Sequence, residues 1–96
     1  MVNLDWQSTE DVGVFKADLG PTLSCWRIDR GASFGDHGHT RPETFVVLTG
    51  AMTFSDSNTA RAGTVIQTSP GERHAATALE ETIFLVATYP DAVAQH

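Results

Sequence analysis

The sequence predicts an all-β domain, either a sandwich or a closed barrel of short strands. Glycine and proline recur throughout the 96 residues and divide the chain into segments of strand length. These segments are rich in β-branched and aromatic residues, which strands favour. No segment has the i, i+3, i+4 apolar spacing of a helix. We expect strands at residues 12–16, 22–30, 43–49, 51–55, 64–67, 74–78 and 82–89.

In the first half of the chain, turn-forming residues separate the expected strands. The dipeptide Gly20-Pro21 lies between the segments 12–16 and 22–30. The next strand, residues 43–49, contains the run Thr-Phe-Val-Val-Leu and ends at Gly50. The pattern therefore indicates tight connections between short strands.

The second half of the chain shows the same alternation of strands and turns. Ser55-Asp56-Ser57-Asn58 is typical of a hairpin turn, because each of these side chains can bond to nearby backbone. Gly63 precedes one later strand and Pro70-Gly71 precedes the next. The last strand, residues 82–89, is a run of β-branched, aromatic and aliphatic residues and gives the strongest signal.

The composition excludes several classes of partner and compartment. Twelve acidic against six basic residues give a net charge of −6, so nucleic acid and anionic membrane surfaces are not expected partners. No run of eighteen apolar residues and no signal peptide are present, and the single cysteine, Cys25, excludes an intramolecular disulfide. We expect a cytoplasmic protein forming a single domain over residues 1–96, with Cys25 as a buried apolar residue.

Three of the four histidines point to a metal site. His37 and His39 are separated by one residue, so on an extended segment both face the same side. Glu43 follows four residues later, and His74 lies in another expected strand. Imidazole and carboxylate ligands without a thiolate suit Zn, Ni, Fe(II), Mn or Cu. Such a set also leaves coordination positions open for a substrate.

These residues stand in a pattern that resembles the cupin family. Residues 31–50 read G-x5-H-x-H-x3-E-x6-G, which resembles the first cupin motif. Residues 63–78 resemble the second motif, G-x5-P-x-G-x2-H-x3-N, through Gly63, Gly71 and His74. Two positions depart from it, with serine for proline at 69 and alanine for asparagine at 78. Neither departure concerns a metal ligand.

The resemblance implies a jelly-roll β-barrel with a single divalent metal ion. By the motif positions, its ligands would be His37, His39, Glu43 and His74. Cupins commonly pair through sheet faces, and Thr44, Val46 and Leu48 would point away from Glu43 and form an outward row, so a homodimer is expected. Residues expected to line a pocket, with the core as the alternative position for most of them, are Trp26, Arg41, Phe45, Met52 and Tyr89.

Fold and metal together do not determine the function. The leading hypothesis is a small metal-dependent enzyme that acts on an oxygenated small molecule by oxygenation, isomerisation or elimination. The alternative is a non-catalytic module that senses or binds a metal or a small ligand, which the lack of an evident acid or base outside the ligand set favours. A third possibility is a barrel in which the metal only clamps strands together. The sequence identifies no catalytic residue.

Overall fold

The computed structural model describes residues 1, 3–38, 42–69 and 73–89, and within them every regular element is a β-strand. None of these residues forms a helix long and apolar enough to cross a membrane. The strands are β1 (Gln7–Ser8), β2 (Val14–Asp18), β3 (Leu23–Ile28), β4 (Ser33–Gly38), β5 (Glu43–Thr49), β6 (Ala51–Phe54), β7 (Thr59–Arg61), β8 (Val65–Thr68), β9 (Arg73–Ala78) and β10 (Thr82–Thr88).

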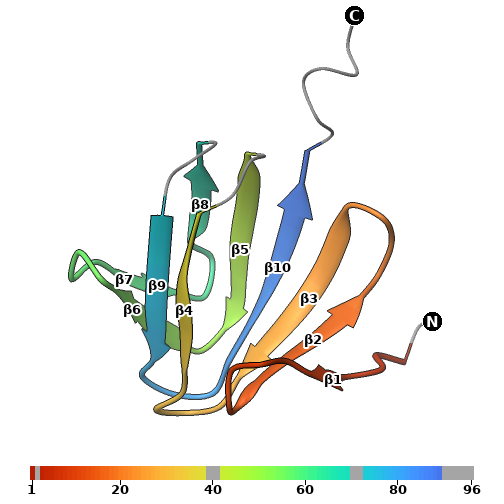
Figure 1. The fold of residues 1–96 in the computed structure, drawn as a ribbon, viewed down its shortest axis with the longest axis horizontal. Helices are drawn as coiled ribbons and strands as arrows, with labels where there is room; N and C mark the ends of the chain where they lie inside the picture. The colour runs from red at the N-terminus through yellow and green to blue at the C-terminus, as the bar shows by residue number, and fades with distance from the viewer. Residues whose placement is uncertain (2, 39–41, 70–72, 90–96) are drawn as a thin grey trace, which may run out of the picture.

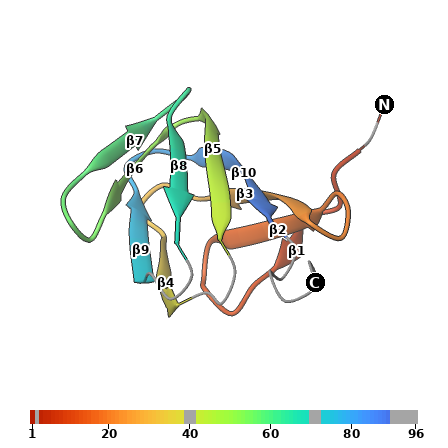
Figure 2. The ribbon, with the colours of Figure 1, turned by 90° about the horizontal axis from the view of Figure 1, so that it is seen from above.

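The strands form two antiparallel sheets that face each other (Figures 1 and 2). One sheet has six strands in the order β1-β2-β3-β10-β5-β8, and the other has four in the order β4-β9-β6-β7. Strands that are neighbours in the sheets are mostly distant in the sequence, as in β3-β10-β5 and β4-β9. The arrangement is a jelly roll, and it confirms the all-β fold class predicted from the sequence.

All seven expected strands are present, six of them with shifted ends, and three further strands were not anticipated. The β6–β7 hairpin turns where predicted, with the backbone N–H of Phe54 donating to the carbonyl of Asn58 at 2.8 Å. The strands β1 and β7 were missed because they have only two and three residues. The strand β4 was missed because its sequence, SFGDHG, contains two glycines and no β-branched residue.

The core fills the space between the sheets and follows the two-residue alternation of the strands. Every second residue is buried in β5 and β10, among them Phe45 and Val47 in β5 and Phe84 and Val86 in β10. The ring of Phe84 lies at the centre of this core. Its centroid is 6.2 Å from that of Trp26, 6.1 Å from that of Phe34 and 6.0 Å from that of Phe45.

Cys25 is buried, as predicted from the sequence. It alternates along β3 with the inward Trp26 and pairs with Ala17 and Leu85 in the neighbouring strands. Burial raises the pKa of its thiol, and a backbone hydrogen bond at Trp26 lowers it by less. The thiol therefore stays protonated at neutral pH and is neither a nucleophile nor a ready metal ligand.

The connection between β5 and β6 is a single residue, Gly50, and it requires glycine. Its φ is +88°, and a Cβ at this position would come within 2.3 Å of the carbonyl oxygen of Glu81 and 2.6 Å of Oγ1 of Thr82. The Thr82 hydroxyl is itself fully buried and accepts a hydrogen bond from the N–H of Ala51 at 3.1 Å. The first neighbour of the added Cβ is backbone, and the second is held by hydrogen bonds to the backbone of Ala51 and Glu80.

We therefore predict that Gly50→Ala destabilises the fold by about 3 kcal/mol or more, because conformational strain and overlap with backbone add together. Gly31→Ala is the matched control, since Gly31 has φ +82° with nothing within 4 Å of an added Cβ. Only the strain applies there, and we expect a loss of about 1–2 kcal/mol. Urea unfolding of both variants measures the difference, and equal losses would contradict the steric argument.

Candidate functional site

The register of β4 and β9 brings two of the expected metal ligands together. His37 is the direct cross-strand partner of His74, and Gly38 is the partner of Arg73. Directly opposed residues in an antiparallel pair have Cα atoms roughly 4.5–5.5 Å apart. Two histidines that are far apart in the sequence therefore lie opposite each other on adjacent strands of the four-stranded sheet.

A β-bulge in β4 determines which face of the sheet this position belongs to. Phe34 pairs with Ala76 and His37 pairs with His74, so three steps along β4 match two steps along β9. Ala76 is buried in the core, and residues two apart on a strand share a face. Position 74 is therefore on the inner face, and the extra residue of the bulge moves position 37 to the same face.

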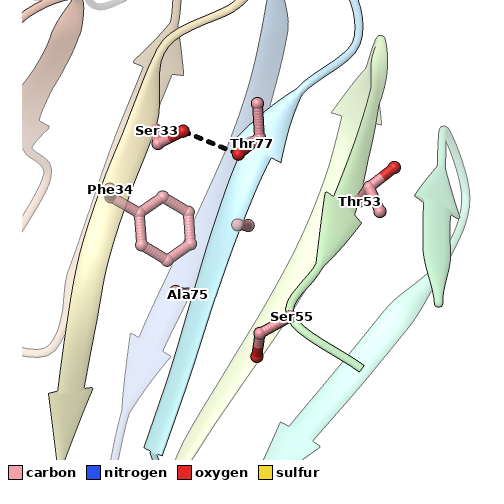
Figure 3. Close-up of a pocket in the computed structure, with 7 residues that line it drawn as sticks. Ser33, Phe34, Thr53, Ser55, Ala75 and Thr77 are labelled. Carbon is pink, nitrogen blue, oxygen red and sulfur yellow. Dashed lines mark hydrogen bonds between the residues drawn. The ribbon is translucent and has the colours of Figure 1, made fainter. Parts of the chain in front are cut away.

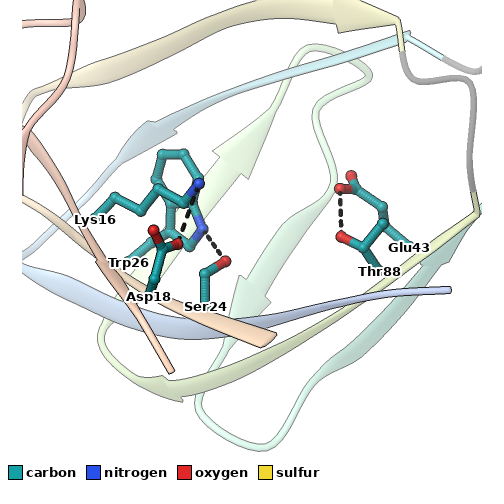
Figure 4. Close-up of polar contacts among 6 residues, drawn as sticks. All are labelled: Lys16, Asp18, Ser24, Trp26, Glu43 and Thr88. Atoms are coloured by element: carbon teal, nitrogen blue, oxygen red, sulfur yellow. Dashed lines mark hydrogen bonds and ion pairs between the residues drawn. The ribbon is translucent and has the colours of Figure 1, made fainter. Parts of the chain in front are cut away.

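Glu43 lies at the start of β5, in the opposite sheet. Glu43 is only 9% exposed, and it continues the inward row formed by Phe45 and Val47. The hydroxyl of Thr88, its partner on β10, donates to Oε2 of Glu43 at 3.2 Å (Figure 4). On the other side Glu43 pairs with the buried Thr68 of β8. The carboxylate is thus held on the inner face by Thr88, while the hydroxyl of Thr68 donates to the backbone carbonyl of Glu43 at 3.5 Å.

The described side chains include only one of the four expected ligands, that of Glu43. Within this part of the chain, no three His, Cys, Asp or Glu residues are grouped so that they could hold a metal ion. His39 lies outside the described residues, and for His37 and His74 the structure gives the backbone position. The assignment of the four ligands therefore stays a prediction.

The residues expected to line a pocket lie in different surroundings. Phe45 and Met52 are part of the buried core, and Arg41 lies outside the described residues. Trp26 is half-buried on the inner face, where its indole N–H donates to Oγ of Ser24 at 2.9 Å (Figure 4). Tyr89 is exposed and its hydroxyl is 2.8 Å from that of Thr44. Their contribution to a pocket stays a prediction.

Near Trp26 the inner face also carries a cation and an anion. The ammonium of Lys16 lies 5.5 Å from the centroid of the Trp26 ring and 3.3 Å from Oδ1 of Asp18. Figure 4 shows these groups across the interior from Glu43 and Thr88. Both charged side chains are exposed and they pair with each other, so they neutralise one another at this end of the sheet.

A separate hollow of about 260 Å³ lies against the four-stranded sheet (Figure 3). The hydroxyls of Ser33 and Thr77 on adjacent strands are 2.6 Å apart at its edge and are exposed, which places it on the outer face. Its lining consists of Ser33, Phe34, Thr53, Ser55, Ala75, Ala76 and Thr77. The lining contains no charged or metal-ligating side chain, so this hollow is not the metal site.

Sequence reasoning did not identify Thr88 as part of the site. A threonine at the end of an apolar strand gives no signal of its own, because its contact with Glu43 depends on the pairing of β5 with β10. The backbone fixes Thr88 in place. Its N–H donates to the carbonyl of Thr22 at 2.8 Å, and the next N–H, of Tyr89, donates to that of Pro42 at 3.2 Å.

We predict that Thr88→Val destabilises the metal-free protein by about 1–3 kcal/mol, because a buried carboxylate loses a hydrogen-bond donor while the shape of the side chain is kept. Thr88→Ser retains the hydroxyl and should lose less than about half of that. Urea unfolding at pH 7 measures both. A valine variant as stable as the wild type would mean that the hydrogen bond to Glu43 contributes nothing.

Comparison with known proteins identifies the fold. A family model described as the ChrR Cupin-like domain matches residues 2–92. A search of curated protein sequences found no match. Among solved structures, the chain is similar to one in the crystal structure of Rhodobacter sphaeroides SigE in complex with the anti-sigma ChrR, with a TM-score of 0.79 and 26% identity. That match covers 91% of this chain and 50% of the other, so this chain spans half the length of that relative.

Two further structures are similar over nearly their whole length. KdgF from Halomonas sp. has 27% identity and a TM-score of 0.70, covering 93% of this chain and 92% of that one. A predicted oxalate decarboxylase from Thermotoga maritima has 22% identity and a TM-score of 0.76, covering 91% of both chains. The predicted cupin resemblance is confirmed, and the chain belongs to the ChrR cupin-like domain family.

Proposed function

We propose that this chain is a metal-binding sensor domain that holds one divalent ion through His37, His39, Glu43 and His74. The observation that carries the proposal is the bulged register of β4 and β9, in which the two histidine positions oppose each other on the inner face. Glu43 lies on the inner face of the opposite sheet. A site of this kind draws ligands from both sheets.

The donor set fits a first-row transition metal or zinc. Imidazole nitrogens and a carboxylate oxygen bind Zn, Ni, Fe(II), Mn and Cu, and the buried thiol of Cys25 alternates away from the inner face. A bound ion would supply a Lewis acid with coordination positions open to an oxygenated or anionic small molecule. The chain itself would orient Glu43 through the hydroxyl of Thr88.

A role in sensing has more support than a role in catalysis. Among the inner-face strand residues whose side chains the structure describes, the titratable ones are Glu43 and the exposed, mutually paired Lys16 and Asp18. Glu43 is assigned to the metal, which leaves no evident general acid or base among these described side chains. The family model is named for ChrR, and the relative of 26% identity occurs in a complex of an anti-sigma with SigE. We infer that the domain has a regulatory role and signals its state to a protein partner.

We predict that Glu43→Gln and His74→Ala each weaken Zn²⁺ binding by at least about 100-fold, because each removes one ligand of the metal. His96→Ala, which lies outside both motifs, is the control and should bind as the wild type does. Calorimetric titration of protein purified without a metal-affinity resin measures the dissociation constants. Unchanged affinity in both ligand variants would refute the site, and metal-dependent turnover of an oxygenated small molecule would favour the enzyme hypothesis.

We also infer that the outer face of the six-stranded sheet pairs with a second copy of the chain. Val46 lies on this face between Leu85 of β10 and Val65 of β8, and Val65 is 58% exposed. Leu48, further along the same outward row of β5, is 45% exposed. A continuous apolar surface across three strands is what an interface between copies requires.

We predict a mass of about 21 kDa in sedimentation equilibrium at micromolar concentration, twice the 10.4 kDa of one chain. Val46→Lys places a charge at the centre of the apolar surface and should give the monomer mass. Thr53→Lys, on the outer face of the other sheet, should leave the dimer intact. A monomeric wild type would contradict the interface.

A further inference from the structure

The bulge in β4 leaves backbone groups that the ladder does not pair in the regular way. Gly35 and Asp36 stand opposite the single residue Ala75, because the registered pairs on either side are Phe34 with Ala76 and His37 with His74. The strand β4 is also the edge strand of its sheet, so no further strand on its other side provides acceptors. An N–H at such a position needs a partner from elsewhere.

Asp11 provides that partner from the other sheet. Its Oδ2 accepts a hydrogen bond from the backbone N–H of Gly35 at 3.3 Å. Asp11 belongs to the turn between β1 and β2, which lie in the six-stranded sheet (Figure 1). The bond therefore joins the N-terminal turn to the bulge, two residues before His37.

The turn presents this carboxylate rigidly. The hydroxyl of Thr9 accepts from the N–H of Asp11 at 3.2 Å and donates to the carbonyl of Val14 at 2.9 Å. The N–H of Val14 in turn donates to the carbonyl of Asp11 at 3.2 Å, and Val14 is anchored in the core. Asp11 is partly buried, so its hydrogen bond to Gly35 is screened less by water than an exposed one.

The bulge matters because strand faces alternate with a period of two. A regular ladder continuing from Phe34 and Ala76 would place position 36 opposite His74 and position 37 on the outer face. One extra residue, held between Phe34 and His37, is what brings position 37 to the inner face. Whatever stabilises the bulge over the regular ladder also keeps His37 in the proposed metal site.

We propose that Asp11 is a positioning residue for that site: by accepting from Gly35 it stabilises the bulge and so keeps His37 opposite His74. This inference rests on the proposed metal-binding function, since His37 is taken as a ligand. Asp11 is not itself expected to touch the metal. Its removal is expected to weaken binding by releasing the bulge, which sets the register of β4 and so the position of His37.

The test compares Asp11→Ala with Asp11→Asn, which removes the charge but retains a side-chain oxygen able to accept from Gly35. Asp56→Ala is the matched control, because Asp56 also accepts from a backbone N–H, that of Asn58 at 3.0 Å, in the β6–β7 turn. Zn²⁺ affinity is measured by calorimetry on folded protein at 25 °C. We expect Asp11→Ala to weaken binding about ten-fold, and the other two variants to stay within about three-fold of the wild type.

A double-mutant cycle with His37→Ala shows whether Asp11 acts through His37. In the His37→Ala background, Asp11→Ala should cause a smaller further loss than in the wild type, whereas a general loss of structure would weaken binding equally in both backgrounds. Amide hydrogen exchange of Gly35 in the metal-free protein gives a readout independent of the metal. Its protection should fall in Asp11→Ala and be retained in Asp11→Asn.

Two results separate failure of this inference from failure of the proposed function. If His37→Ala binds Zn²⁺ as tightly as the wild type, the metal site itself is wrong. If His37→Ala binds weakly while Asp11→Ala stays within two-fold of the wild type, only the role of Asp11 is overturned. Reduced protection of Gly35 with unchanged Zn²⁺ affinity would equally restrict Asp11 to a structural role.

Discussion

The contact between the two sheets at Phe84 is the interaction on which the rest of the structure depends. Phe84 stands in the six-stranded sheet beside Trp26 and Phe45, and Phe34 reaches it from the four-stranded sheet. Burial of one such ring contributes roughly 2–3 kcal/mol. It also fixes which face of β4 points inward, and the pairing of Phe34 with Ala76 transmits that choice to β9. The inner-face position of His74 follows from this contact, and that of His37 requires the bulge in β4 as well.

The strands with strong apolar signals could be predicted from the sequence. The two strands that carry the histidines could be predicted only in part. Residues 43–49 and 82–88 are strands because their alternate residues pack in the core, a pattern visible in the sequence itself. The strand β4 contains glycine, aspartate and histidine, and it forms because β9 pairs with it. Local composition does not encode such long-range pairing, so the strand had no local signal.

The motif resemblance supplied the ligand set that local reasoning could not assemble. Spacing alone placed His37 and His39 on one face of an extended segment, but the bulge at Gly35 and Asp36 was invisible to it. The contacts of Thr88 with Glu43 and of Asp11 with Gly35 were likewise unpredictable. Each joins residues at least 24 apart in the sequence, and each depends on a register that only the folded chain defines.

The chemistry of the two outer faces differs, and this difference bears on how the proposed sensor would act. The four-stranded sheet presents hydroxyls to water, among them those of Ser33 and Thr77. The six-stranded sheet presents an apolar row around Val46. A second copy is therefore expected on the six-stranded sheet, since burying apolar side chains gains free energy.

The strand β5 connects the proposed metal site to that apolar face. It carries Glu43 on its inner side and Val46 and Leu48 on its outer side, all within one seven-residue strand. A ligand can shift a conformational equilibrium only as far as its affinities for the two states differ. A metal ion that draws ligands from both sheets meets this condition, because its binding depends on how closely β5 approaches β4 and β9. Movement of β5 would then reach the outer face directly, without a separate relay.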